Sequence, residues 1–124
     1  MTIVADEGDG PVIVFLHGIA SSAATFSGVI PQLSDRYRCI SFDLLGFGES
    51  PIPPSSTYTI EEHVDSIRAT INSLKLHAPF IVVGHSLGSL LAARYAATHP
   101  SRVSRLVLVS PPLYVPPSQI GDPL

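Results

Sequence analysis

The chain has 124 residues, a mass of 13.2 kDa and a formal net charge of −3, which suits one small domain. Charged residues make up only 14%, the pI is near 5.9 and the basic residues form no run, so the basic surface of a nucleic-acid-binding protein is excluded. The single cysteine, Cys39, excludes an internal disulfide. With no apolar run of about 18 residues and no basic, apolar leader at the start, we expect a cytoplasmic protein.

Short apolar runs rich in β-branched residues alternate along the chain with helical patterns. These runs cover residues 11–16, 38–43, 79–84 and 103–110, and residues 2–5 are expected to add a short edge strand. Runs that are apolar on both faces are typical of parallel strands that are covered on each side. The runs therefore predict the strands of a mostly parallel sheet.

Three helices are expected between these strands. Thr59 opens the clearest one as a capping box with a glutamate three residues later, and an apolar stripe at helical spacing follows. A second helix over residues 87–98 is apolar on nearly all sides, so we expect it to be buried. A third covers residues 24–34 and contains Pro31. This alternation predicts an α/β fold with an open, mostly parallel sheet and helices on both faces.

Residues 84–88 read Gly-His-Ser-Leu-Gly and fit G-x-S-x-G between a predicted strand and a predicted helix. That setting is typical of a nucleophile elbow. Gly84 and Gly88 leave room in the tight turn, and Ser86 lies at the positive N-terminal end of the helix. A serine hydroxyl becomes an effective nucleophile only with a base and with donors for the oxyanion. The backbone N–H of Leu87 is suitably placed to be one donor.

With two further motifs, the chain resembles the α/β-hydrolase superfamily. Residues 17–20, His-Gly-Ile-Ala, look like that family's His-Gly oxyanion loop, and residues 43–50 look like its Asp-x-x-Gly-x-Gly-x-Ser turn. The three motifs follow predicted strands in the family's order, and the resemblance spans about the first half of the usual fold. It implies Ser86 as the nucleophile, the backbone N–H groups of Leu87 and Ile19 as the oxyanion hole, and the supporting motif residues His17, Gly18, Gly84, His85 and Gly88.

The family's base and acid have no evident counterpart downstream. The triad order in this family is Ser, then Asp or Glu, then His, and only Asp122 and His99 follow Ser86. A helix of about 12 residues places His99 about 18 Å from the turn, which is too far for proton transfer. Asp122 lies in the Pro-rich tail 111–124, expected to be the start of a truncated cap region. We therefore expect one partial domain, an incomplete α/β-hydrolase fold over residues 1–124, that is inactive when isolated.

The resemblance implies a serine hydrolase that acts on an ester or similar acyl substrate through an acyl-enzyme. The serine argues against the branches with an aspartate nucleophile, such as epoxide hydrolases. Two alternatives remain: an acyltransferase of the same fold, and a non-catalytic fragment or interaction module. No cofactor or metal is implied, because this route of acyl transfer needs neither. A small acyl substrate is the expected partner, with neither nucleic acid nor a membrane.

Some features have structural interpretations. The strand at 103–110 is expected to leave an exposed apolar edge through which the isolated chain self-associates. His17 and Asp43 are expected to form hydrogen bonds within their loops, and His99 is expected to lie at a helix end. His63 and His77 are expected on the surface, and Cys39 in the core.

Overall fold

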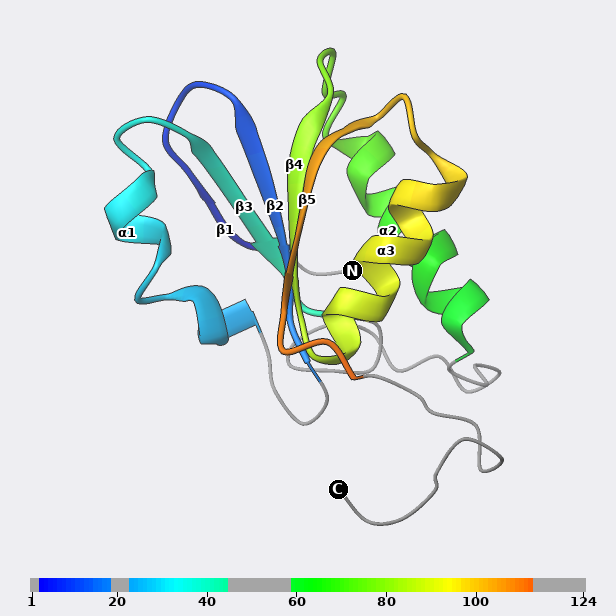
Figure 1. The fold of residues 1–124 in the computed structure, drawn as a ribbon. Coiled ribbons are helices and arrows are strands. Elements are labelled where there is room, and N and C mark those ends of the chain that lie inside the picture. Colours follow the sequence, from blue (N-terminus) through cyan, green and yellow to red (C-terminus); the bar gives the residue numbers. More distant parts are fainter. Residues whose placement is uncertain (1–2, 19–22, 45–58, 113–124) are drawn as a thin grey trace, which may run out of the picture.

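The computed structural model describes residues 3–18, 23–44 and 59–112 (Figure 1). Within this part of the chain, one sheet contains five strands in the order β1-β3-β2-β4-β5. Their bounds are Ile3–Glu7 (β1), Val12–Leu16 (β2), Arg38–Phe42 (β3), Phe80–His85 (β4) and Val103–Val109 (β5). The pairs β2–β3, β2–β4 and β4–β5 are parallel, and β1 pairs antiparallel with β3 at one edge. The predicted α/β fold with an open, mostly parallel sheet is confirmed.

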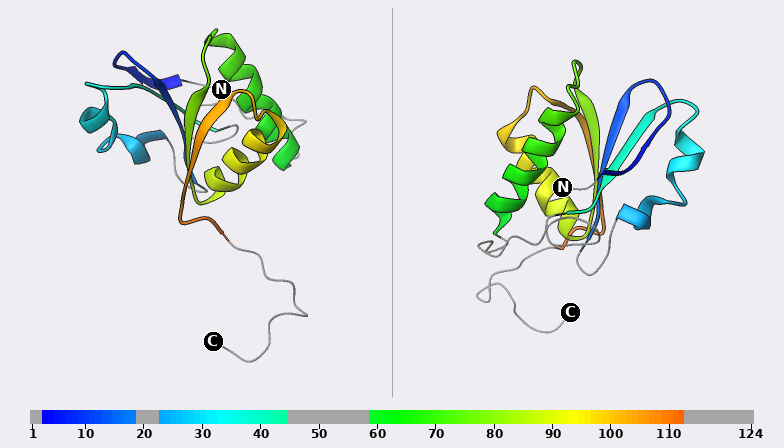
Figure 2. Two further views of the ribbon diagram at one scale, coloured as in Figure 1. Left: turned by 45° about the horizontal axis from the view of Figure 1, so that its top comes forward. Right: turned by 180° about the vertical axis from the view of Figure 1, so that it is seen from behind.

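Helices lie on both faces of this sheet, as predicted. The long helices α2 (Ile60–Ser73) and α3 (Leu87–Thr98) lie side by side on one face, and the short helices η1 (Ala23–Phe26) and α1 (Ile30–Leu33) lie on the other (Figure 2). The predicted N-cap of α2 is confirmed, because the Thr59 hydroxyl accepts the backbone N–H of Glu62 at 3.1 Å.

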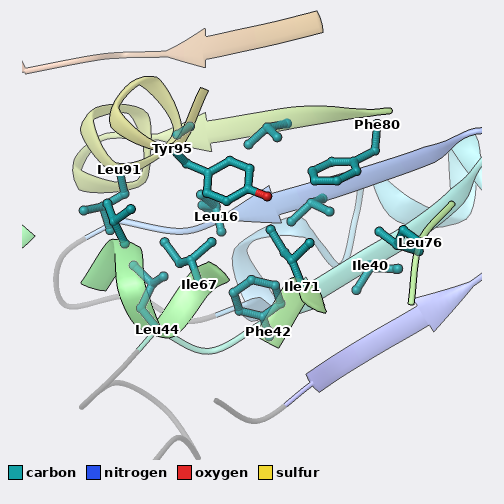
Figure 3. Packing of buried hydrophobic residues seen from close by; sticks show 14 residues of the cluster. Leu16, Ile40, Phe42, Leu44, Ile67, Ile71, Leu76, Phe80, Leu91 and Tyr95 are labelled. Carbon is teal, nitrogen blue, oxygen red and sulfur yellow. The ribbon is translucent and has the colours of Figure 1, made fainter. Parts of the chain in front are cut away.

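Two apolar clusters fill the space between the sheet and its helices, and β2 contributes to both. Val14 and Leu16 point into the larger cluster under α2 and α3, whereas Ile13 and Phe15 point into the smaller one under η1 and α1. Successive side chains of a strand point to opposite faces, so a central strand covered on both sides must be apolar throughout. Figure 3 shows the larger cluster, in which side chains from three strands meet those of both long helices.

The single helix predicted over residues 24–34 is wrong. The chain forms a 3-10 turn and then one short α-helix, joined by i→i−3 hydrogen bonds such as Val29 N–H to Phe26 O at 3.0 Å. Pro31 is the physical reason, because it has no N–H to donate to the preceding turn. It lies instead in the first turn of α1, where that N–H is not required.

The expectation that the helix over residues 87–98 is buried holds for one side only. Leu91, Ala92 and Tyr95 pack against the sheet and α2, but Leu90 on the opposite side is 38% exposed. The described part of the chain contains no further layer over that side. Helix composition therefore predicted more burial than the described residues provide.

The strand β5 forms the second edge of the sheet. In the described residues β4 is its only partner strand, and the side chains of residues 106–109 are 38–44% exposed. Residues 107 and 109 lie on the face opposite α3, and 106 and 108 lie on the face toward it. The predicted apolar edge is therefore present. Among the described helices, none combines the length and hydropathy needed to cross a bilayer.

Candidate active site

Three segments that follow parallel strands meet at one end of the sheet. These are His17 and Gly18 after β2, Asp43 and Leu44 after β3, and the turn between β4 and α3. The carboxyl ends of parallel strands are the usual location of a ligand site in an open α/β sheet. The three motifs found in the sequence therefore converge, as far as the described residues extend into them.

Ser86 occupies the turn between β4 and α3 with φ 55° and ψ −119°. A positive φ is unfavourable for a residue with a side chain, and such backbone strain is concentrated at functional sites. Its backbone N–H donates to the carbonyl of Val109 at 3.0 Å, and its hydroxyl caps no amide of α3. The turn thus places a partly exposed serine at the N-terminus of a 12-residue helix.

Two glycines let the turn form between closely packed backbones. A Cβ on Gly84 would lie 2.7 Å from the Ser89 Cα, and one on Gly88 would lie 2.6 Å from the carbonyl oxygen of His17. Both distances are below those that real Cβ atoms show, and the contacted atoms are backbone or Cα atoms that cannot simply rotate away. The first turn of α3 therefore rests directly on the end of β2 because position 88 has no side chain.

One of the two predicted oxyanion-hole donors, Leu87, lies within the described residues. Leu87 is the first residue of α3, so its N–H belongs to the amides that a helix leaves without an intrahelical partner. Gly18 lies against the turn, since a Cβ there would be 2.9 Å from the Ser86 Cβ. Ile19, the other predicted donor, and residues 45–50 of the Asp-x-x-Gly-x-Gly-x-Ser turn lie outside the described residues.

His17 is fully buried and links two of the converging segments. Its Nε2 accepts the backbone N–H of Leu44 at 2.8 Å, and its Nδ1 lies 2.8 Å from the carbonyl of Gly18. These partners require a neutral ring with the proton on Nδ1, which donates to the Gly18 carbonyl. Burial lowers the pKa of His17, although the Gly18 hydrogen bond and the nearby Asp43 carboxylate oppose the shift. The imidazole thus connects the His-Gly segment to the end of β3.

His63 was expected at the surface, and this is wrong: on α2 it is only 4% exposed. Burial lowers the pKa of His63, and repulsion from a positively charged His17 ring lowers it further. The Glu62 carboxylate opposes this decrease. The sequence did hold a signal, because His63 is three residues after Ile60 and four before Ile67, at the margin of the apolar stripe. His77 is exposed, as expected.

The other predicted residues are distributed as follows. The Nδ1 of His85 is buried, lies 3.4 Å from a Cβ built on Gly18, and has no hydrogen-bond partner among the described residues. His99 ends α3, at the end opposite Ser86, and stacks on Tyr95 with ring centroids 4.5 Å apart. In the described ranges no hydrogen bond joins a histidine to Ser86. Asp122 lies outside those ranges.

Known proteins are similar to this chain in both sequence and fold. A probable lysophospholipase of Arabidopsis thaliana, BODYGUARD 2, is 41% identical over 114 residues, which cover 87% of this chain and 24% of that protein. A probable hydrolytic enzyme of Pseudomonas aeruginosa PAO1 is similar in structure, with a TM-score of 0.78 and 37% identity over 88% of this chain and 35% of its own. The epoxide hydrolase VrEH1 of Vigna radiata gives a TM-score of 0.84 with 32% identity, over 94% of this chain and 38% of its own.

The chain thus spans about a quarter of the length of that plant relative and just over a third of these solved structures. The sequence profile of the alpha/beta hydrolase fold matches residues 11–122, nearly the whole chain. The chain therefore belongs to the alpha/beta hydrolase fold family.

Proposed function

We propose that this chain is the nucleophile-bearing segment of a serine hydrolase, and that Ser86 attacks the acyl carbon of an ester or similar substrate. The observation that carries the proposal is the Ser86 turn itself: positive φ, a helix N-terminus behind it, and Gly18 packed against it. The hydroxyl adds to the acyl carbonyl, and its proton passes to a base as the tetrahedral oxyanion forms. Collapse of that intermediate expels the alcohol and leaves an acyl-serine, which water hydrolyses to restore the hydroxyl.

The Leu87 N–H supports the oxyanion in this scheme, aided by the positive end of α3. Ile19 is proposed as the second donor. The names of similar proteins include probable lysophospholipases and epoxide hydrolases. We favour an acyl ester because position 86 is serine, which can form an ester intermediate, and because lysophospholipids carry an acyl ester.

The base and the acid of the reaction are proposed to come from chain beyond this segment, since none of its five histidines is hydrogen-bonded to Ser86 in the described ranges. The isolated 124-residue chain is then inactive toward esters. An acyltransferase of the same fold differs only in the acceptor, so the same acyl-serine serves both.

A fluorophosphonate probe, which labels activated serines, tests the proposal. We compare the isolated chain with a chimera in which it replaces the segment of BODYGUARD 2 that it matches. The folded chimera should be labelled, Ser86→Ala should abolish labelling, and Ser101→Ala, at an exposed turn position, should not change it. Labelling that survives Ser86→Ala, or none in a folded chimera, would refute the nucleophile. Labelling of the isolated chain at Ser86 would refute the need for an external base.

A further inference from the structure

A second buried hydroxyl lies just below the nucleophile turn. Ser89, the third residue of α3, is only 1% exposed. Its Oγ donates to the carbonyl of Gly84 at 2.8 Å and lies 3.1 Å from the carbonyl of Val109. A hydroxyl has a single proton, so these two carbonyls share one donor. A serine within a helix usually donates to the carbonyl four residues earlier. The Ser89 hydroxyl instead contacts a carbonyl five residues earlier, at Gly84 in β4, and a carbonyl of β5, at Val109.

The carbonyl of Val109 receives a second donor, the backbone N–H of Ser86, at 3.0 Å. The Val109 carbonyl oxygen, at the end of β5, therefore lies within hydrogen-bond distance of both the Ser86 N–H and the Ser89 hydroxyl. Strain marks both sides of this junction, because Ser86 has φ 55° and Ser110, directly after Val109, has φ 48°. Paired strain at residues joined by one hydrogen-bonded carbonyl indicates that the surroundings over-determine the geometry.

We propose that Ser89 is a positioning residue for Ser86, a role that rests on the proposed function for its catalytic meaning. Its hydroxyl contacts the Gly84 carbonyl of β4, the strand that leads into the turn, and the Val109 carbonyl of the neighbouring strand β5. It thereby holds the ends of the two strands together. The positive φ of Ser86 and the direction of the Leu87 N–H are thereby fixed before any substrate arrives. Ser89 touches neither substrate nor the reacting atoms.

Removal of the hydroxyl has a local and predictable effect. Ser89→Ala leaves the buried Gly84 carbonyl without this donor and removes one of the two donors that the described residues give to the Val109 carbonyl. A buried hydrogen bond contributes about 1 kcal/mol, so the amide of Ser86 should exchange with solvent roughly fivefold faster. Amides in the middle of α2 should change only by the amount that the global free energy of unfolding changes.

Hydrogen exchange on the full 124-residue chain, resolved by NMR at the Ser86 and Leu87 amides, provides the test. Thr70→Ala is the matched control, because Thr70 is also a buried helix hydroxyl, donating to the Ser66 carbonyl at 2.9 Å. Ser89→Ala should accelerate exchange at Ser86, Thr70→Ala should not, and Ser89→Thr, which retains a hydroxyl, should restore slow exchange. If Ser89→Ala does not fold, Ser89→Cys, similar in size and a weaker donor, gives the same comparison.

Equal exchange at Ser86 in wild type and Ser89→Ala, or acceleration that is uniform over the chain, would overturn the positioning role. Probe labelling in the chimera separates this result from failure of the proposed function. Ser89→Ala should slow labelling severalfold while Ser86→Ala abolishes it. If Ser86→Ala leaves labelling intact but exchange responds as expected, the serine-hydrolase proposal fails and the structural role of Ser89 stands.

Discussion

Acidification is expected to destabilise the fold through two buried histidines. His17 is fully buried and His63 is 4% exposed, and burial lowers the pKa of both rings. In the unfolded chain each ring takes up a proton near pH 6.5, whereas in the fold burial moves this uptake to a lower pH. The unfolded state therefore binds more protons, and the free energy of unfolding falls as the pH falls below 6.5. Above that range the contribution of both rings is fully present.

The magnitude follows from the number of protons. A ring that stays neutral in the fold down to about pH 5.5 costs about 1.4 kcal/mol between about pH 7.5 and 5.5, so about 3 kcal/mol is the most that both rings together can cost. The Asp43 and Glu62 carboxylates favour the protonated rings and so reduce this loss of stability. Repulsion between the two rings acts in the opposite direction, because protonation of one disfavours protonation of the other. For His17 the reason is also geometric, because a proton on Nε2 would face the Leu44 N–H that it now accepts.

Urea unfolding followed by far-ultraviolet circular dichroism suits this chain, which has no tryptophan. The free energy of unfolding is measured at several values between about pH 7.5 and 5.5. His63→Gln should weaken the pH dependence, because it removes one of the two rings whose pKa burial lowers. A free energy that stays constant over this range, or a pH dependence that persists in a folded variant lacking both buried histidines, would refute the reasoning.

Three further predictions concern the site, the sheet edge and a helix cap. Gly18→Ala puts a methyl group 2.9 Å from the Ser86 Cβ, so it should reduce probe labelling of the chimera about tenfold or more. Gly28→Ala, where a Cβ meets nothing within 4 Å, should leave labelling unchanged, and equal losses would contradict the proposed proximity. We propose that the isolated chain self-associates through β5; light scattering should detect oligomers that Val107→Lys disperses, and a wild-type monomer at all concentrations would speak against it. Thr59→Ala should lower the free energy of unfolding by about 1 kcal/mol, and an unchanged urea midpoint would exclude the cap as a source of stability.

Much of the fold could be predicted because its signals are local. The central strand β2 had to be apolar on both faces, and the Thr59 cap and the stripe behind it depend on residues a few positions apart. Periodicity alone predicts one helix through Pro31, but the missing N–H of this proline ends the preceding turn and begins a separate short helix. The exposed side of α3 could not be foreseen, since composition does not reveal how many layers cover a helix.

The candidate site could be predicted in part for the same reason. The motif around Ser86 requires glycines at fixed spacing, and the structure accounts for them by the close approach of α3 to β2. The links of Ser89 and Ser86 to Val109 could not be predicted, because they join residues about 20 positions apart through a backbone carbonyl. Every residue has a backbone carbonyl, so the residue type at position 109 does not indicate that its carbonyl accepts these hydrogen bonds.

The shared carbonyl at Val109 has a consequence for the order of events during synthesis. Protein chains leave the ribosome from the N-terminus, so the serine emerges before the strand that fixes it. The hydrogen bond from the Ser86 N–H to the Val109 carbonyl can form only once β5 lies beside β4. The hydroxyl that we propose as the nucleophile would therefore gain this support from a neighbouring strand only late in synthesis.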